Sequence, residues 1–74
     1  MSTLSIMDVT GDEKLSWDPS DDLSTARARK RFAELIGKGY KAYRINHVGG
    51  KGEKIDEFDP FAQEIVMHRV AVGG

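Results

Sequence analysis

Apolar and polar residues alternate in two short stretches at the start of the chain, which predicts two strands. The first stretch is Thr3–Val9 and the second is Lys14–Trp17, with the turn-forming sequence Thr10-Gly11-Asp12 between them. Residues two apart in a strand lie on the same face, so each strand has one apolar side. The pattern therefore predicts an N-terminal hairpin whose apolar side holds Leu4, Ile6, Leu15 and Trp17.

The period changes at Asp18, where a helix is predicted to begin. Asp is a good N-cap and Pro19 suits the first helical position, so we expect a helix over roughly Ser20 to Ile36. Apolar residues at i, i+4, i+7 and i+8 form one stripe, as in a helix packed on a sheet. These residues are Ala28, Phe32, Leu35 and Ile36. Gly37-Lys38-Gly39 supplies a residue able to adopt positive φ and ends the helix near Gly37.

The second half of the chain predicts three more strands. Tyr40–Asn46 is rich in aromatic and β-branched residues, and Glu53–Phe58 is a weaker strand expected toward an edge of the sheet. Asp59-Pro60 repeats the capping pattern of Asp18-Pro19 and predicts a single helical turn. Glu64–Val72 is apolar on both faces, which is typical of a central strand.

This order of elements predicts an α+β domain in which one helix covers one face of a mixed sheet. The 74 residues are expected to form a single domain with its core over 3–72 and a flexible tail at 73–74. A chain this short buries only about 60% of its unfolded surface, so a deep catalytic cleft is not expected. We expect a protein that is not an enzyme.

Composition narrows the function further. The 11 Lys and Arg residues nearly balance the 12 Asp and Glu residues, which makes a dedicated nucleic-acid binder unexpected. The chain has no Cys, so a disulfide framework, a thiol nucleophile and a Cys-type zinc site are excluded. No apolar run is long enough to cross a bilayer and the N-terminus does not read as a signal peptide, so we expect a cytoplasmic protein, or a virion protein if it is phage-encoded.

Three polar motifs contain residue types that can carry chemistry. The basic run Arg27–Arg31 spreads its charges around the helix, which favours a solvated surface over a phosphate-binding stripe. Gly49–Lys54 is rich in glycine, but it lacks the Ser or Thr and the following helix of a P-loop, so a hairpin turn is expected. His47 and His68 have no Cys to complete a zinc site. We therefore expect no metal and no cofactor.

No pair of carboxylates or Ser-His arrangement is placed for catalysis, so the aromatic residues and the tail are the candidate functional positions. Most of the large aromatic side chains are expected in the core. Trp17 and Phe61 are the partner-binding candidates if either is exposed, because aromatic anchors dominate protein interfaces. Gly73-Gly74 ends the chain with an unhindered carboxylate, which suits the narrow tunnel of an activating enzyme; the alternative is a frayed end.

The element order, with a last strand leading directly into Gly73-Gly74, resembles the β-grasp of ubiquitin-like proteins and sulfur carriers. That resemblance implies that the carboxylate of Gly74 is the functional group. A second set of motifs is similar to small bacterial and tailed-phage proteins and implies no activity. These motifs are Thr10-Gly11-Asp12, Trp17-Asp18-Pro19, Gly39-Tyr40, Phe58-Asp59-Pro60 and the Gly-Gly end.

Three functions follow as hypotheses. The first is a non-catalytic β-grasp protein that acts as a modifier or carrier through Gly73-Gly74, with an activating enzyme as its partner. The second is an accessory or structural protein of a phage or mobile element that binds virion proteins. The third is a weak nucleic-acid binder. None of the three requires a cofactor or a membrane.

Overall fold

The computed structural model describes residues 1–8, 11–46 and 52–69. Within these ranges the chain forms one helix between two pairs of strands, followed by a last strand. The elements are β1 (Ser2–Asp8), β2 (Gly11–Trp17), α1 (Asp22–Gly37), β3 (Tyr40–Ile45), β4 (Glu53–Ile55) and β5 (Glu64–Arg69).

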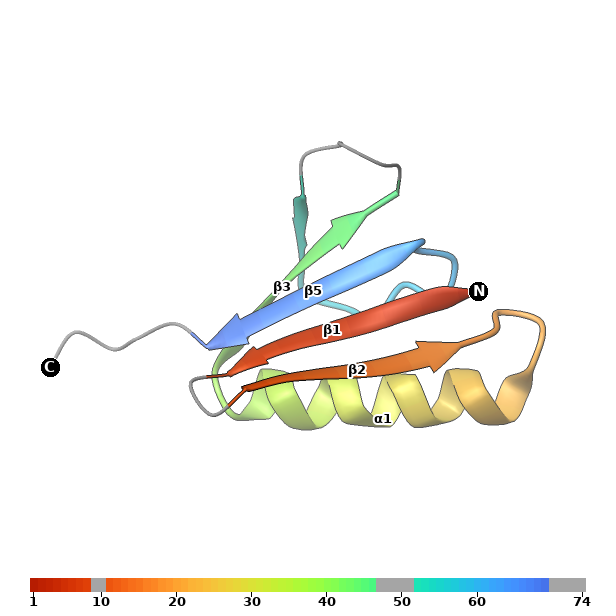
Figure 1. The fold of residues 1–74 in the computed structure, drawn as a ribbon, viewed down its shortest axis with the longest axis horizontal. Coiled ribbons are helices and arrows are strands. Elements are labelled where there is room, and N and C mark those ends of the chain that lie inside the picture. Colours follow the sequence, from red (N-terminus) through yellow and green to blue (C-terminus); the bar gives the residue numbers. More distant parts are fainter. Residues whose placement is uncertain (9–10, 47–51, 70–74) are drawn as a thin grey trace, which may run out of the picture.

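The five strands form one mixed sheet in the order β2-β1-β5-β3-β4 (Figure 1). β5 pairs in parallel with β1 and antiparallel with β3, while the other neighbours are antiparallel. The last strand is therefore central and β4 lies at an edge, as predicted. The architecture is an α+β, β-grasp-like fold, which confirms the predicted fold class.

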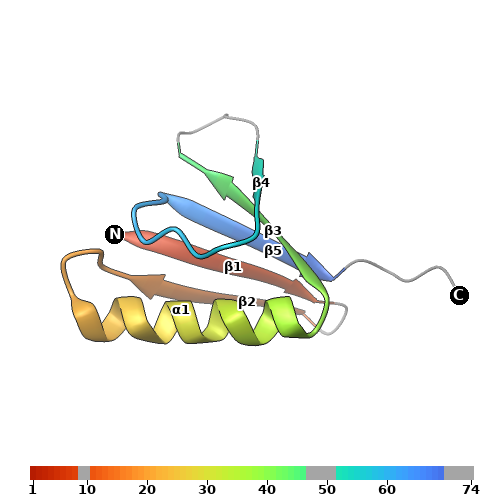
Figure 2. The same cartoon turned by 180° about the vertical axis from the view of Figure 1, so that it is seen from behind.

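The core lies between α1 and one face of the sheet (Figure 2). Leu4 of β1 lies opposite Leu15 on β2 and opposite Ile65 on β5, so one register places apolar side chains from three strands under the helix. Three members of the predicted helical stripe are buried and the fourth, Ile36, packs against the core, which confirms the predicted stripe. The buried members are Ala28, Phe32 and Leu35.

The start of α1 differs from the prediction. The N-cap is Asp21 and not Asp18, because residues 18–21 form a turn in which the Asp21 N–H donates to the Asp18 carbonyl oxygen at 2.8 Å. The Asp18 carboxylate accepts hydrogen bonds from the backbone N–H and the hydroxyl of Ser20, and these bonds lower the pKa of Asp18. Asp21 caps the helix by accepting from the Ser24 N–H at 3.4 Å. Pro19 therefore lies in the turn, outside the helix.

The end of α1 agrees with the prediction. The helix ends at Gly37, Lys38 is the C-cap, and Gly39 follows with φ of +93°, a backbone conformation that suits glycine. Within the described residues, no helix is long and apolar enough to cross a membrane. β5 is described as far as Arg69, so the predicted end of this strand and the Gly73-Gly74 tail lie outside the described residues.

Candidate functional site

Trp17 is buried, which corrects its assignment as a partner-binding candidate. Its side chain lies on the helix side of β2 and is 0% exposed. The indole Nε1 donates a hydrogen bond to the carbonyl oxygen of Pro60 at 3.0 Å, and the ring centroid lies 5.0 Å from that of Phe58. Trp17 thus joins β2 to the loop before β5 and is closed to a partner.

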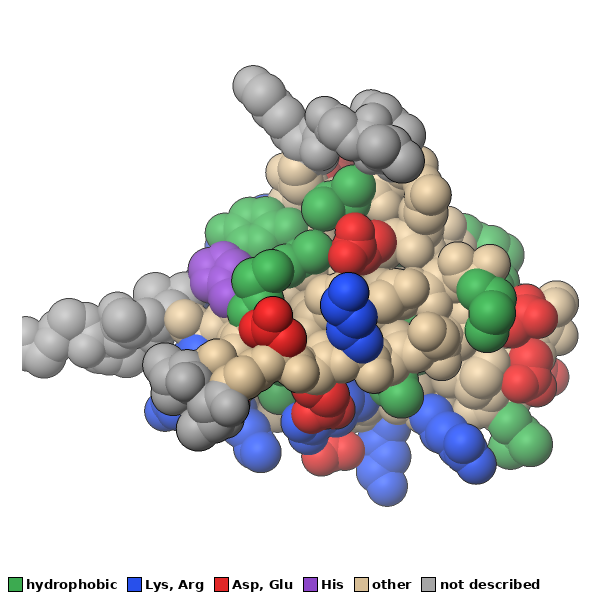
Figure 3. Space-filling model, viewed as in Figure 1, with side chains coloured by type: hydrophobic (Ala, Val, Ile, Leu, Met, Phe, Trp, Pro, Cys, Tyr) green, Lys and Arg blue, Asp and Glu red, His purple; other side chains and the backbone are tan. Residues whose placement is uncertain are grey.

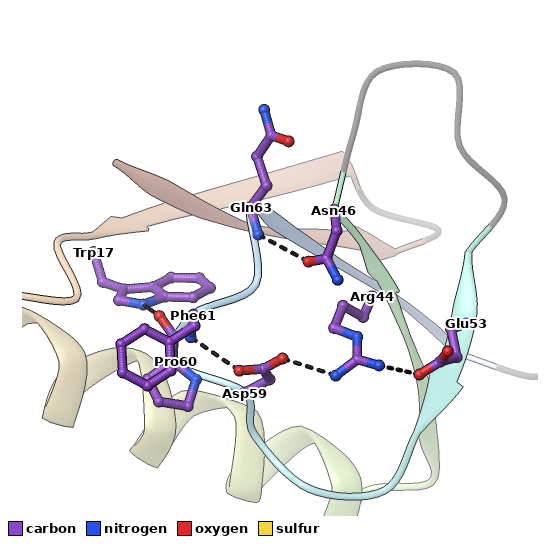
Figure 4. A network of polar contacts seen from close by, with 8 residues as sticks. All are labelled: Trp17, Arg44, Asn46, Glu53, Asp59, Pro60, Phe61 and Gln63. Carbon is purple, nitrogen blue, oxygen red and sulfur yellow. Dashed lines mark hydrogen bonds and ion pairs between the residues drawn. The ribbon is translucent and has the colours of Figure 1, made fainter.

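Phe61 is the second sequence candidate, and it is 81% exposed. It lies in a turn formed by residues 59–62, which we call the Phe61 turn (Figure 4). The N–H groups of Phe61 and Ala62 both donate to Asp59, to its Oδ1 at 2.9 Å and to its carbonyl oxygen at 3.2 Å. The segment is a single turn capped by Asp59, as the Asp-Pro pattern predicts, and it does not continue into a helix. Ala62, which follows Phe61, is fully buried.

Arg44 fixes the Phe61 turn to the sheet. Its guanidinium lies between two carboxylates, with Nη1 2.8 Å from Asp59 Oδ2 and Nη2 paired with Glu53 (Figure 4). The hydrogen bond to Asp59 is the main reason that the pKa of Arg44 is raised above its ordinary value. The Phe61 turn is therefore fixed at two points, by the ion pair between Arg44 and Asp59 and by the hydrogen bond from Trp17 to Pro60.

The open face of the sheet, opposite α1, carries a second exposed group of side chains. Tyr43 and His68 stack with ring centroids 5.4 Å apart and an interplanar angle of 5°. Val66 pairs with Tyr43 across β3 and β5, and Met7 pairs with His68 across β1 and β5. We call Met7, Tyr43, Val66 and His68 the open-face patch. Figure 3 shows this histidine among hydrophobic side chains on the face turned away from α1.

The open-face patch remains accessible because it lies on the side of the sheet that α1 does not cover. Met7 is 48% exposed, and the other three side chains are half-buried. Lys41 and Lys54 lie on the same face, since Lys41 pairs with His68 and Lys54 pairs with Tyr43. An apolar, partly aromatic strip beside lysines can bind a protein surface.

The described residues hold no group of three or more His, Asp or Glu side chains that could bind a metal ion. Arg31 of the basic run forms ion pairs with two carboxylates. Its Nη2 lies 3.0 Å from Glu13 Oε1, and its Nη1 lies 3.9 Å from Glu34 Oε2. His47 and most of the glycine-rich loop lie outside the described residues, as do Gly73 and Gly74.

Sequence reasoning missed the open-face patch because it assigned most aromatic residues to the core. The available signal was strand alternation. Ala42 and Arg44 are on the helix side of β3, so Tyr43 between them must face outward.

Comparison of the chain with known protein families, curated proteins and solved structures finds no match.

Proposed function

We propose that this chain is a non-catalytic β-grasp protein that acts as a modifier or carrier through its C-terminal Gly73-Gly74. The observation that supports this proposal is the position of β5. This central strand carries Val66 and His68 on the open face and is the element that leads toward the two glycines. A partner that binds the open-face patch would therefore hold the strand that precedes the reactive terminus.

The chemistry follows from an unhindered terminal carboxylate. An oxygen of the Gly74 carboxylate attacks the α-phosphorus of ATP, which forms an acyl adenylate and releases pyrophosphate. A thiol, an amine or a hydrosulfide ion then attacks the acyl carbon, loses its proton to solvent, and displaces AMP. The product is a thioester, an amide or a thiocarboxylate of Gly74, respectively. An activating enzyme supplies the ATP site, and this chain supplies the carboxylate and the surface that the enzyme recognises.

The test is activation by an enzyme from the organism that encodes the chain. Wild-type protein should form an acyl adenylate, detected as ATP–pyrophosphate exchange. Gly74→Ala should reduce the exchange because a methyl group obstructs a narrow tunnel, while melting temperature stays unchanged. Addition of one residue after Gly74 should abolish it. Equal exchange by all three proteins would contradict a role for Gly74.

A binding role without the tail is the second candidate, and exposed Phe61 favours it. An aromatic side chain 81% exposed on a fixed turn is the kind of anchor that contributes strongly to protein interfaces. An accessory or virion protein would use such an anchor and leave the Gly74 carboxylate free. Genes for an adenylating enzyme beside this gene would support the carrier, whereas head or tail genes would support the accessory role.

A further inference from the structure

Two parts of the domain surface, outside the open-face patch and the Phe61 turn, are complementary to each other. The first is an apolar groove between α1 and the loop that follows β4, which passes beside the helix in Figure 2. Its volume is about 360 Å³. Four apolar side chains and two carboxylates line it: Phe32, Ala33, Ile36, Phe58, Asp56 and Glu57.

The groove is acidic at its rim. Asp56 and Glu57 are exposed, and neither makes an ion pair within the described residues. The single cation in its lining, Arg29, lies over the Phe58 ring with its guanidinium carbon 5.7 Å from the ring centroid. The two carboxylates outnumber this cation, so the groove favours an occupant with an apolar group beside positive charge.

The second part is the solvent face of α1, where an apolar side chain lies beside two cations. Leu23 is 73% exposed, an unusual position for a leucine in a helix whose opposite face forms the core. Arg27 and Lys30 follow it at i+4 and i+7, so all three lie along one side of the helix. Both cations are exposed and make no ion pair with the described residues. Asp22 lies about 100° away around the helix. Glu34 lies on the same side as Leu23, about three turns further along, and is 3.9 Å from the guanidinium of Arg31.

We propose that Leu23 of one copy of this chain enters the groove of a second copy, where Arg27 and Lys30 pair with Asp56 and Glu57. Phe61 is a poorer occupant, because the residues around it in its turn, from Asp59 to Gln63, include no cation that could pair with the groove rim. Leu23 and the groove are different surfaces of the same chain, so the contact is either made twice in a two-fold dimer or repeated head-to-tail through more copies. The measured mass distinguishes these two arrangements.

Sedimentation velocity of the full chain over rising concentration, up to about 1 mM, tests this contact. The average mass should rise with concentration above that of the monomer. Leu23→Asp should weaken the association by about tenfold or more, because it places a carboxylate in an apolar, acidic groove. Phe61→Asp is the matched control, since it changes an equally exposed apolar side chain, and it should leave the association unchanged.

Charge reversal gives the sharper test. The double variant Arg27→Glu, Lys30→Glu and the double variant Asp56→Lys, Glu57→Lys should each remain monomeric alone. An equimolar mixture should associate, because each groove again meets a helix of opposite charge. All four positions are exposed, so both variants should melt as the wild type does. A wild-type chain that stays monomeric at about 1 mM, or a mixture that fails to associate, overturns the proposal.

Discussion

The indole Nε1 of Trp17 lies 3.0 Å from the carbonyl oxygen of Pro60 and donates a hydrogen bond to it, across 43 positions of the sequence. The bond joins two segments with the same aromatic-Asp-Pro pattern, Trp17-Asp18-Pro19 and Phe58-Asp59-Pro60. Their aromatic rings are also in contact, at 5.0 Å between centroids. In each segment the Asp side chain accepts from a backbone N–H two residues later, so each forms a turn. The two turns thus meet through one ring pair and one hydrogen bond.

Trp17→Phe should reveal the contribution of that hydrogen bond together with that of the ring volume that phenylalanine leaves empty. Phenylalanine keeps an aromatic ring in the site but has no N–H, so the Pro60 carbonyl loses its donor. We expect a loss of about 1–3 kcal/mol in the free energy of unfolding, measured by chemical denaturation. A replacement that leaves the unfolding midpoint unchanged would show that water satisfies the carbonyl equally well.

Phe32→Ala and Phe61→Ala form a matched pair that tests the helix-on-sheet core. Phe32 is 3% exposed, so Phe32→Ala should lower the free energy of unfolding by about 3–5 kcal/mol. That is a large part of the roughly 5–10 kcal/mol expected for a domain of this size. Phe61 is 81% exposed and should change stability by only about 0.5 kcal/mol or less. Thermal melts compare the two variants directly, and similar melting temperatures for both would contradict the assignment of the core.

Ionisation of the Tyr40 hydroxyl should lower the stability of the fold at alkaline pH. Burial, followed by the charge of Asp8, whose Oδ2 accepts the Tyr40 hydroxyl at 3.2 Å, raises the pKa of Tyr40. Because the pKa is higher in the folded state, the protonated Tyr40 hydroxyl contributes fully to stability below the unfolded pKa of about 10. This contribution is lost as the pH rises through the folded pKa. Tyr40→Phe should therefore flatten the fall in unfolding free energy above about pH 10.

Arg44→Gln should loosen the Phe61 turn without unfolding the domain. The substitution removes the ion pairs to Asp59 and Glu53 while the backbone pairing of β3 remains. We expect faster amide hydrogen exchange at Ala62, whose N–H donates to the Asp59 carbonyl, than in the wild type. Exchange within β1 and β5 should stay the same. Lys41→Gln removes a β3 cation that makes no ion pair with the described residues, and it should change neither.

Periodicity predicted the fold well because most elements carry a strong local signal. The helical stripe from Ala28 to Ile36 and the alternation around Leu4 determine which faces meet, and both are properties of short segments. The Asp-Pro segments were harder to predict. Asp18 and Asp59 each use the side chain to close a turn, and an Asp before Pro is equally compatible with a helix cap.

The candidate surfaces depend on contacts between distant segments, which the sequence does not encode locally. Trp17 and Phe61 both lie beside an Asp-Pro turn. Trp17 is buried and packs against Phe58, whereas Phe61 is exposed, and this difference arises from tertiary packing. The open-face patch requires the pairing of β5 with both β1 and β3, because that pairing brings Met7, Tyr43 and His68 together.

Intact-mass analysis of the protein isolated from the organism that encodes it tests the central proposal most directly, with Val66→Asp and Gly74→Ala compared in parallel. The wild type should carry either a sulfur in place of one terminal oxygen or an isopeptide bond from Gly74 to an amine. Val66→Asp, which places a charge in the open-face patch, and Gly74→Ala should both lose that product while remaining folded. A wild-type protein found only with a free Gly74 carboxylate, or a product that persists in both variants, would contradict the account.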